Sequence, residues 1–414
     1  MTLKKNILLV SSKYMPEYSG SGFRAHNLYK RLCSKNPELS LTVLCGSVTE
    51  NECLDYEHDG FKVHRVACKP CIGTKSGYWG QKWCEIRNFS AENGKTAEFL
   101  TRLGEKPDLI HIFGRNFVTA SAAIYARENN IPLITELCNE MDYPFQYVPF
   151  PNNLWIDCSL PERSLFVCIS QQLKKVCLQS GIKDELIWCR PNPVDENKFK
   201  PVDEARKHFL RSKLTGFGTD KKLIVYIAKF RKSKNHIFLL DVLKNLPEDF
   251  VLYMKGPLVE NGPLLDEDRS AFNSLKTKID EYCLQNRVML EAGFCENIEE
   301  YYQMADVYAF PSMSEGLGTP VLEAIACGVP VVSNKIPDVT DVWIKDGENG
   351  YVSVLETNTF AKNMQNSLSI MSDVLRLNSK QILEKASSSV IDGKYLDVIG
   401  GKLKQKILRA MDNK

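Results

Sequence analysis

Short runs of β-branched and other apolar residues alternate with amphipathic segments along most of the chain. The predicted strands are 6–12, 41–45, 61–66, 108–113, 132–137, 165–170, 186–189, 221–230, 249–256, 287–293, 305–312, 329–333 and 350–354. The predicted helices are 22–35, 90–103, 117–129, 171–180, 235–246, 264–285, 297–304 and 319–327. Buried strands separated by crossover helices indicate an α/β fold with parallel, doubly wound sheets.

A stretch rich in proline, asparagine and charge interrupts this pattern at 190–204, and it has no hydrophobic period. Such a segment is typical of a linker between domains. The 414 residues leave room for two domains of ordinary size. We therefore expect an N-terminal α/β domain at 1–195 and a C-terminal α/β domain at 200–390.

The last segment, 393–414, is predicted to form an amphipathic helix. Leu403, Ile407, Leu408 and Met411 fall on one face, and the opposite face is basic. The simpler interpretation is a helix that docks on a domain. The alternative is a helix in contact with an anionic membrane surface.

The charge balance limits the classes of partner. Lys and Arg number 53 and Asp and Glu 51, a net charge of +2, so no nucleic acid partner is expected. No stretch approaches the roughly 20 apolar residues of a membrane span. The apolar run at 7–10 is too short for a signal peptide, so a cytoplasmic location is expected.

The cysteines do not form a metal-binding pattern. Cys68 and Cys71 have CxxC spacing and Cys84 follows, but no second ligand pair does. We interpret these residues as structural or loop thiols rather than metal ligands.

Segment 309–333 carries the strongest functional signal. A strand is followed by a turn with Gly316 and Gly318, and Thr319 is predicted as the N-cap of a helix with Pro320 at its first position. Such a turn forms an anion site, because unpaired N–H groups and a helix dipole of roughly +0.5 charge point outward. Glycines that serve only a tight turn are the alternative.

Two carboxylates flank this turn: Glu315 precedes it and Glu323 lies on the new helix. Both would repel a diphosphate, but they suit the hydroxyl groups on either side of one. A nucleotide sugar offers ribose hydroxyls at one end and hexose hydroxyls at the other, and carboxylates accept strongly from them. Two solvated glutamates are the alternative.

A bound diphosphate also needs cations. Lys229 and Lys234 follow the strand at 221–230, at the edge where open α/β sheets bind ligands. Their charge would match that of a departing diphosphate. A solvated, basic loop is the alternative.

With these residues identified, the chain resembles the retaining family 4 glycosyltransferases (group 1 type) of the GT-B fold. The family's two glutamates with seven residues between them match Glu315 and Glu323, and its basic pair falls on Lys229 and Lys234. The family pattern S-x-x-E-G-x-G-x-P-x-L-E-A-x-A-x-G-x-P-V-V is met across 312–332. The resemblance covers about residues 5–355.

This resemblance implies two Rossmann-like domains with parallel sheets that face across a cleft. The C-terminal domain would hold the donor, the N-terminal domain would bind the acceptor, and the helix at about 393–414 would pack back on the N-terminal domain. Catalytic roles are implied for Lys229, Lys234 and Glu315. Donor contacts are implied for Gly20, Gly316, Leu317, Gly318, Thr319 and Glu323.

The activity implied is transfer of a hexose, with retention, from a nucleotide-diphosphate sugar to a saccharide or lipid-linked acceptor, in surface polysaccharide or glycan biosynthesis. A leaving phosphate oxygen would deprotonate the acceptor, and the lysines and helix dipole would stabilise the leaving group. Neither a metal nor a cofactor is expected. If the enzyme transfers sugar to lipid-linked acceptors, we expect it to contact the inner face of a membrane peripherally.

The sequence departs from the family pattern at several positions. Lys229 stands where Arg is usual and lacks its planar fork. His111 matches the first His of the family's D-x-x-H-x-H strand, but Phe113 replaces the second. We therefore interpret His111 as a core residue.

Where many family members have a His-Asp pair, this chain has Glu136, Asn139 and Glu140. The substitution suggests a subgroup in which carboxylates face the acceptor.

Four other interpretations stand beside this one. The D-x-D sequence at 266–268 could bind a metal, but it does not follow a strand and is interpreted as the charged start of a helix. Gly20, Gly22 and Ala25 form a weak nicotinamide fingerprint, without an acidic residue after the second strand. A non-catalytic sugar-nucleotide-binding subunit, favoured by Phe113, and a GT-B epimerase or phosphorylase also stay open.

Overall fold

The computed structural model describes residues 4–17, 19–47, 52–68, 77–137, 164–258 and 265–402. The chain divides into two compact units. Unit 1 comprises Met1–Arg190 with Asp392–Lys414, and unit 2 comprises Pro191–Ile391. The chain thus passes into unit 2 at Pro191, at the start of the segment 190–204. It returns to unit 1 at Asp392.

Unit 1 is built on an eight-stranded sheet in the order β3-β4-β2-β1-β5-β6-β7-β8. Its strands are β1 (Lys5–Ser11), β2 (Leu39–Ser47), β3 (Leu54–His58), β4 (Phe61–Ala67), β5 (Leu109–Phe113), β6 (Leu133–Leu137), β7 (Ser164–Cys168) and β8 (Ile187–Cys189). All neighbours pair in parallel except β3 and β4, which form an antiparallel hairpin at the edge.

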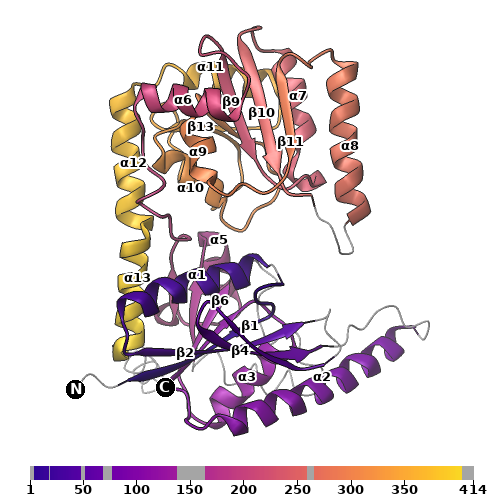
Figure 1. Cartoon of the computed structure of the whole chain (residues 1–414), viewed down its shortest axis with the longest axis vertical. Coiled ribbons are helices and arrows are strands. Elements are labelled where there is room, and N and C mark those ends of the chain that lie inside the picture. Colours follow the sequence, from indigo (N-terminus) through magenta and orange to yellow (C-terminus); the bar gives the residue numbers. More distant parts are fainter. Residues whose placement is uncertain are drawn as a thin grey trace. The chain divides into compact units, whose positions relative to one another are not determined.

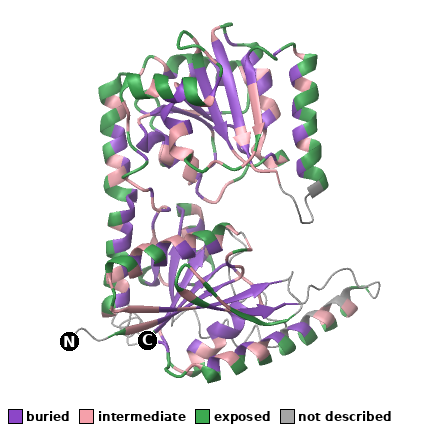
Figure 2. Ribbon diagram, viewed as in Figure 1, coloured by how far each residue is buried: buried purple, intermediate pink, exposed green. Residues whose placement is uncertain are grey.

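The helices of unit 1 cover this sheet (Figure 1). They are α1 (Gly20–Lys35), α2 (Gly77–Arg102), α3 (Phe117–Glu128) and α5 (Gln171–Gln179), with a short 3-10 turn, η3 (Asp184–Leu186). Strands β5, β6 and β7 are buried along their whole length, as expected of parallel strands covered on both faces. Figure 2 shows this buried interior against the exposed outer faces of the helices.

Unit 2 is built on a six-stranded, fully parallel sheet in the order β11-β10-β9-β12-β13-β14. Its strands are β9 (Lys222–Ile227), β10 (Phe250–Gly256), β11 (Val288–Ala292), β12 (Val307–Phe310), β13 (Val331–Asn334) and β14 (Gly350–Ser353). The order reverses between β9 and β12. Ligands of open α/β sheets bind at the carboxyl ends of the strands beside such a reversal.

The helices of unit 2 are α6 (Glu204–Leu214), α7 (His236–Lys244), α8 (Leu265–Glu281), α9 (Ile298–Gln303), α10 (Thr319–Ala326), α11 (Thr357–Ser367) and α12 (Ser372–Ala386), with a 3-10 turn, η4 (Lys232–Lys234). Helix α13 (Ser388–Asp397) carries the chain back into unit 1, where η5 (Val398–Lys402) follows. The apolar face predicted at 403–411 lies outside the described residues.

The two α/β units confirm the predicted fold class, but the predicted local structure missed or misplaced five elements. Strand β3 was missed because its sequence, LDYEH, is polar and mostly exposed. Helix α2 begins at Gly77, well before the predicted 90–103, and α6 begins inside the predicted linker. Helices α11 and α12 were not predicted.

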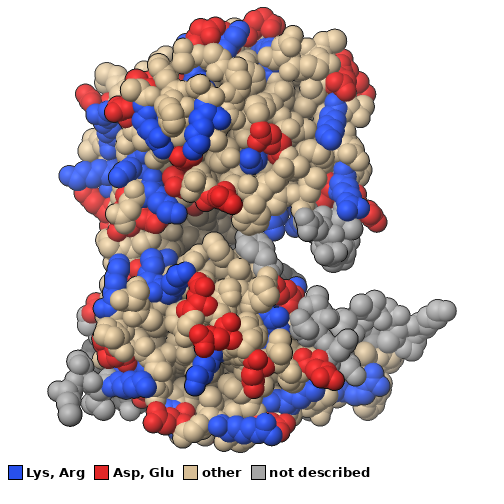
Figure 3. Space-filling model, viewed as in Figure 1, with Lys and Arg blue, Asp and Glu red and all other residues tan. Residues whose placement is uncertain are grey.

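Among the described residues, no helix is long and apolar enough to cross a membrane. Both signs of charge are mixed on the face of each unit that Figure 3 shows. The predicted cytoplasmic location stays a prediction.

Candidate functional site

The loops that follow β9 and β12 meet at one edge of the unit 2 sheet. Residues 224 and 225 of β9 pair in parallel with 307 and 308 of β12, so both strands end at the same edge. The Met313 N–H donates to the Ser233 carbonyl at 2.9 Å, which joins the two loops directly. The Tyr226 hydroxyl donates to the Lys234 carbonyl at 2.7 Å and anchors the first loop to its own strand.

The second loop is also tied to the strand beyond it. Asn334, at the end of β13, donates from Nδ2 to the Ser312 carbonyl at 2.9 Å. Thr340 donates from Oγ1 to the Asn334 carbonyl at 2.9 Å. Because three neighbouring strand ends are connected in this way, the edge is held in a defined shape before any ligand arrives.

Two predicted catalytic residues form an ion pair across these loops. Lys234 Nζ lies 2.5 Å from Glu315 Oε1, and both side chains are partly buried. The sequence predicted that Lys234 would meet a diphosphate and Glu315 a sugar hydroxyl. In this structure the two side chains instead form an ion pair with each other.

Lys229 lies in the loop just beyond β9 and is exposed. Partial desolvation, together with the positive charges of Arg231 and Lys234, lowers the pKa of Lys229. Lys229 and Lys234 both belong to the loop that follows β9, so both lie at this edge of the sheet. Arg231 is held by Asp268 of α8 through two hydrogen bonds of 3.1 Å.

The glycine turn ends differently from the prediction. The N-cap of α10 is Gly318, in the left-handed region at φ 71° and ψ 46°, and the helix begins at Thr319. Thr319 is therefore the first helical residue and not the N-cap, and its hydroxyl accepts a hydrogen bond of 2.8 Å from Asn192 Nδ2. Gly318 adopts this conformation without the strain that a side chain would add.

The backbone of this turn presents N–H donors. Within the described part of the chain, the N–H groups of Gly316, Leu317, Gly318 and Thr319 have no acceptor. Leu317 and Gly318 are themselves buried, so these donors are fixed in a packed turn. Together with the dipole of α10, they form a cradle for an anion.

Glu323 lies one turn into α10 and faces Tyr302 of α9. The Tyr302 hydroxyl donates to Glu323 Oε2 at 2.8 Å. Desolvation by the surrounding protein raises the pKa of Glu323 to about 7, and the Tyr302 bond opposes this rise. The carboxyl group therefore changes its protonation near neutral pH.

In unit 1, Gly20 is the first residue of α1, after the carboxyl end of β1. It is exposed, and an added Cβ would meet nothing within 4 Å. Gly22 is different, because a Cβ there would lie 2.3 Å from the Lys13 carbonyl oxygen. Close packing of the loop thus accounts for the second glycine of the weak nicotinamide fingerprint.

The acceptor-side prediction for Glu136 needs correction. Its side chain is fully buried, and Arg190 donates to it at 2.8 Å. Burial alone would raise the Glu136 pKa, but the charge of Arg190 and hydrogen bonds from His111 and Tyr395 outweigh it and lower the pKa. The carboxylate is a structural group of the unit 1 core, not an exposed one.

His111 is fully buried within the same network, as its interpretation as a core residue requires. Its Nδ1 lies 2.8 Å from the Tyr29 hydroxyl and its Nε2 lies 3.2 Å from Glu136. Phe113 is buried too. Asn139 and Glu140 lie outside the described residues.

The D-x-D sequence falls in the first turn of α8, where Asp268 is buried against Arg231. Of the two cysteines with CxxC spacing, Cys71 lies outside the described residues. His26, His58 and Asp59 form a group with metal-ligand atoms, the one such group in the described ranges. There Asp59 already pairs with Lys30 at 2.6 Å, and His26 bonds to Tyr14 at 2.8 Å.

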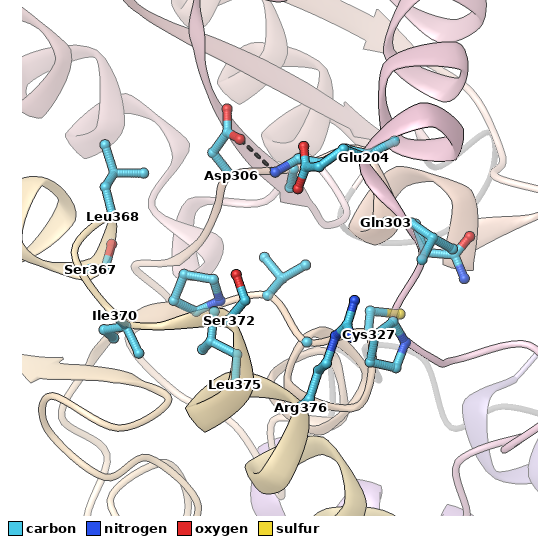
Figure 4. A pocket seen from close by; sticks show the side chains of 17 residues that line it. Glu204, Gln303, Asp306, Cys327, Ser367, Leu368, Ile370, Ser372, Leu375 and Arg376 are labelled. Atoms are coloured by element: carbon cyan, nitrogen blue, oxygen red, sulfur yellow. Dashed lines mark ion pairs between the residues drawn. The ribbon is translucent and has the colours of Figure 1, made fainter.

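A separate cavity of about 200 Å³ lies in unit 2 at the amino ends of the strands. It is lined by residues that precede β12 and β13, and the ion pair of Asp306 and Lys207 crosses its wall (Figure 4). Figure 4 also shows Arg376 of α12 beside Cys327 at the opposite wall. None of the predicted site residues line this cavity.

Sequence reasoning missed the residues that position the site. Tyr302, Tyr226 and Asn334 act through single hydrogen bonds to groups distant in the chain. No local pattern distinguishes them from ordinary core or helix residues.

Solved structures with the same arrangement cover nearly the whole chain. HepE from Anabaena in complex with UDP superimposes with a TM-score of 0.71, at 17% identity, over 96% of this chain and 100% of the other. Sucrose-phosphate synthase from Thermosynechococcus elongatus superimposes with a TM-score of 0.70, at 17% identity, over 98% and 100%. The fold is GT-B. At 17% sequence identity, the structural similarity supports the GT-B fold and nothing more specific.

Sequence comparison identifies a known family in the C-terminal half of the chain. Residues 210–370 match the model of the family "Glycosyl transferases group 1". D-inositol 3-phosphate glycosyltransferase of Mycolicibacterium smegmatis is 32% identical over 184 residues, which are 44% of this chain and 38% of the relative.

A second relative is the Escherichia coli UDP-Gal:alpha-D-GlcNAc-diphosphoundecaprenol alpha-1,3-galactosyltransferase. It is 24% identical over 226 residues, 53% of this chain and 54% of the relative. The chain spans about half or less of the length of the curated relatives it matches.

Proposed function

We propose that this protein is a metal-independent, retaining hexosyltransferase that moves a sugar from a nucleotide-diphosphate sugar to a saccharide or lipid-linked acceptor. One observation carries the proposal. The loops after β9 and β12 bring Lys229, Lys234 and the open N–H donors of residues 316–319 to the same sheet edge. The family match at 210–370 spans this edge and supports the same assignment.

The arrangement suits a leaving diphosphate. When the bond between the anomeric carbon and the phosphate oxygen breaks, negative charge grows on that oxygen. Lys229, Lys234 and the dipole of α10 would stabilise this charge without the reorganisation that water would need. Lys234 would exchange its bond with Glu315 for one with the diphosphate, and Glu315 would then accept from a sugar hydroxyl.

The acceptor oxygen forms the new bond to the anomeric carbon on the face that the diphosphate leaves. The acceptor's proton passes to the departing phosphate oxygen, so anomeric configuration is kept and no protein base is required. This route is compatible with a buried Phe113 and with a Glu136 that is committed to Arg190.

At the other end of the donor, Glu323 would accept hydrogen bonds from the ribose hydroxyls, with Tyr302 orienting the carboxylate. Gly20 would approach the donor from unit 1. The relatives' names support donors of the UDP-sugar kind and acceptors that include a lipid-linked sugar, and hence a role in polysaccharide or glycan biosynthesis.

The test is a panel of UDP-, GDP- and ADP-sugars with the full chain, read first by thermal shift and then by release of nucleoside diphosphate. A true donor raises the melting temperature by mass action, and turnover releases the diphosphate. Donor binding without any release, even by slow hydrolysis, would identify a non-catalytic subunit. Conversion of the donor to an epimer would identify an epimerase. Either result would overturn the proposal.

A further inference from the structure

The tip of the β3–β4 hairpin in unit 1 brings two histidines and an aspartate together. His58 and Asp59 lie at the tip, and His26 reaches them from α1, 33 positions before Asp59 in the chain. One potential ligand atom from each of the three residues lies within 4.8 Å of those from the other two. Only the tertiary structure brings His26 to the other two residues.

The hairpin holds its two residues in a tight turn. Asp59 and Gly60 both have positive φ, at 48° and 80°, and His58 pairs with Phe61 across the turn. These are the features of a two-residue type I′ turn, which an Asp-Gly sequence favours. His58 and Asp59 therefore lie on a defined scaffold and not on a long loop.

The ring of His26 is also held in place. Its side chain is buried, and its Nδ1 lies 2.8 Å from the Tyr14 hydroxyl. Arg65 in turn donates to the Tyr14 carbonyl at 2.9 Å. The other ring nitrogen of His26, Nε2, is directed at the hairpin and lies 3.2 Å from Asp59 Oδ2. A hydrogen bond at one ring nitrogen is the usual way in which proteins orient a histidine that binds a metal through the other.

Hydrogen bonding within the cluster does not account for His58. Its ring centroid lies 5.1 Å from that of His26, with the planes tilted by 58°. Among the residues that the structure describes, however, the His58 imidazole has no hydrogen-bond partner. A partly buried imidazole beside a second imidazole and a carboxylate has the surroundings that a transition-metal ion requires.

We propose that His26, His58 and Asp59 bind one Zn²⁺ ion, which fastens the β3–β4 hairpin to α1. Two imidazole nitrogens and one carboxylate oxygen, with water in the fourth position, suit tetrahedral zinc. Ligands about 2.0–2.1 Å from such an ion lie about 3.3 Å from one another. The 3.2 Å between His26 and Asp59 already meets this value, and rotation of the His58 side chain brings in the third ligand. The two imidazoles favour zinc over Mg²⁺ and Ca²⁺, which prefer oxygen ligands.

One cation competes with zinc for this site. Lys30 Nζ lies 2.6 Å from Asp59 Oδ2, the same oxygen that faces His26. The Lys30 side chain is 59% exposed, so its ammonium group turns into water at little cost, because exposed ion pairs are weak. Zinc binding therefore displaces Lys30 from Asp59, and the presence of Lys30 lowers the affinity for zinc.

This site is separate from the proposed reaction. Strands β1, β2 and β4 run parallel, and β4 begins directly after the turn, which places the hairpin tip at the amino edge of the sheet. Gly20 follows the carboxyl end of β1, at the opposite edge. The inference does not depend on the proposed function, because zinc binding is measured without transfer.

The test is isothermal titration of the full chain with zinc chloride, after a chelator has been applied and removed. We expect one equivalent of zinc to bind. At a zinc concentration one hundred times Kd, the melting temperature should rise by about 5–10 °C, and EDTA should reverse the rise. Mg²⁺ at the same concentration should leave the melting temperature unchanged.

Asp59→Asn is the most informative variant, because Asn-Gly keeps the type I′ turn while the carboxylate is lost. It should lower the zinc affinity by roughly a hundredfold, as should His58→Gln. Lys30→Gln should have the opposite effect and raise the affinity by roughly fivefold, since it removes the competing charge.

Asp55→Asn is the matched control on the same hairpin. Asp55 pairs with His64, but the described residues add no third ligand there. This variant should bind zinc as tightly as the unaltered protein. Binding of Co²⁺ to the unaltered protein tests for cysteine ligands, because thiolates add a strong ultraviolet charge-transfer band that imidazole and carboxylate ligands lack. We expect no such band.

Three results would overturn the proposal. The first is the absence of stoichiometric zinc binding by the unaltered protein. The second is an unchanged zinc affinity in both Asp59→Asn and His58→Gln. The third is a thiolate band in the Co²⁺ spectrum, which would assign the bound metal to cysteines.

Discussion

Lys234 and Glu315 form an ion pair, with Nζ and Oε1 2.5 Å apart, across two loops that are 81 positions apart in the chain. In the proposed reaction, arrival of a diphosphate breaks this pair and gives each partner a ligand group. The pair holds the two loops together in this structure, and under the proposed mechanism Lys234 would supply a cation during transfer.

Lys234→Ala should depress turnover at saturating donor by roughly a hundredfold or more, because it removes a cation from the developing charge. The free energy of unfolding should change by about 1 kcal/mol or less, since the pair is only partly buried. Steady-state kinetics and urea unfolding measure the two effects. Lys232→Ala, an exposed neighbour in η4, is the control and should retain turnover. Full turnover in Lys234→Ala would contradict the leaving-group role.

Donor affinity should rise between pH 6 and pH 8, because Glu323, with a pKa of about 7, ionises there and becomes a stronger acceptor for hydroxyl groups. Calorimetric titration of the donor across this range measures the effect. Glu323→Gln should bind more weakly and lose the pH dependence. A variant that keeps the same profile would place the titrating group elsewhere.

The same raised pKa makes a prediction about stability. At pH values below the ordinary carboxyl pKa of 4.5, Glu323 is protonated in both the folded and the unfolded state. It then does not change the free energy of unfolding. As pH rises from there through 7, the unfolded chain ionises first, so the folded state loses stability, by at most about 3 kcal/mol. Glu323→Gln removes this loss, so the variant should gain stability relative to the natural chain as pH rises to 8.

Tyr302→Phe should move the midpoint of the donor-affinity profile to higher pH. The Tyr302 hydroxyl donates to Glu323 and lowers its pKa, so its removal leaves desolvation less opposed. The shift is read from the same titrations. An unchanged midpoint would mean that Tyr302 has only a packing role.

Gly318→Ala should destabilise the protein by about 1–2 kcal/mol and weaken donor binding, because φ is 71° there and a side chain strains that conformation. Space is not the cause, since the nearest atom to an added Cβ would be Phe310 Cε1 at 3.5 Å. Gly216→Ala, at an exposed position in unit 2 with open space, is the control. Urea unfolding compares the two. Equal stability of both variants would contradict the argument.

Arg190→Met should destabilise the protein by about 3–5 kcal/mol, because it leaves the Glu136 carboxylate buried without its cation. The double variant Arg190→Met/Glu136→Leu should recover part of this loss, since no charge then stays buried. Chemical unfolding of the single and double variants measures the difference. If the double variant is as unstable as the single one, packing rather than charge is responsible.

The predictions from sequence succeeded where the signal is local. The runs that became β5, β6 and β12 are short and mostly apolar, which favours buried parallel strands without knowledge of their neighbours. The turn at 316–318 was recognised because glycines between a strand and a helix have few other uses. Strand β3 was missed because an exposed edge strand needs no apolar residues.

Sequence alone determined the two α/β halves and predicted which residue types would meet a diphosphate, because burial periodicity and turn chemistry act over a few neighbouring residues. Tertiary structure decided which groups meet. It paired Lys234 with Glu315 and Tyr302 with Glu323, and it placed Glu136 in the core with Arg190. These contacts join positions separated by 21 to 81 residues, and the protonation of each group depends on burial and on such distant partners.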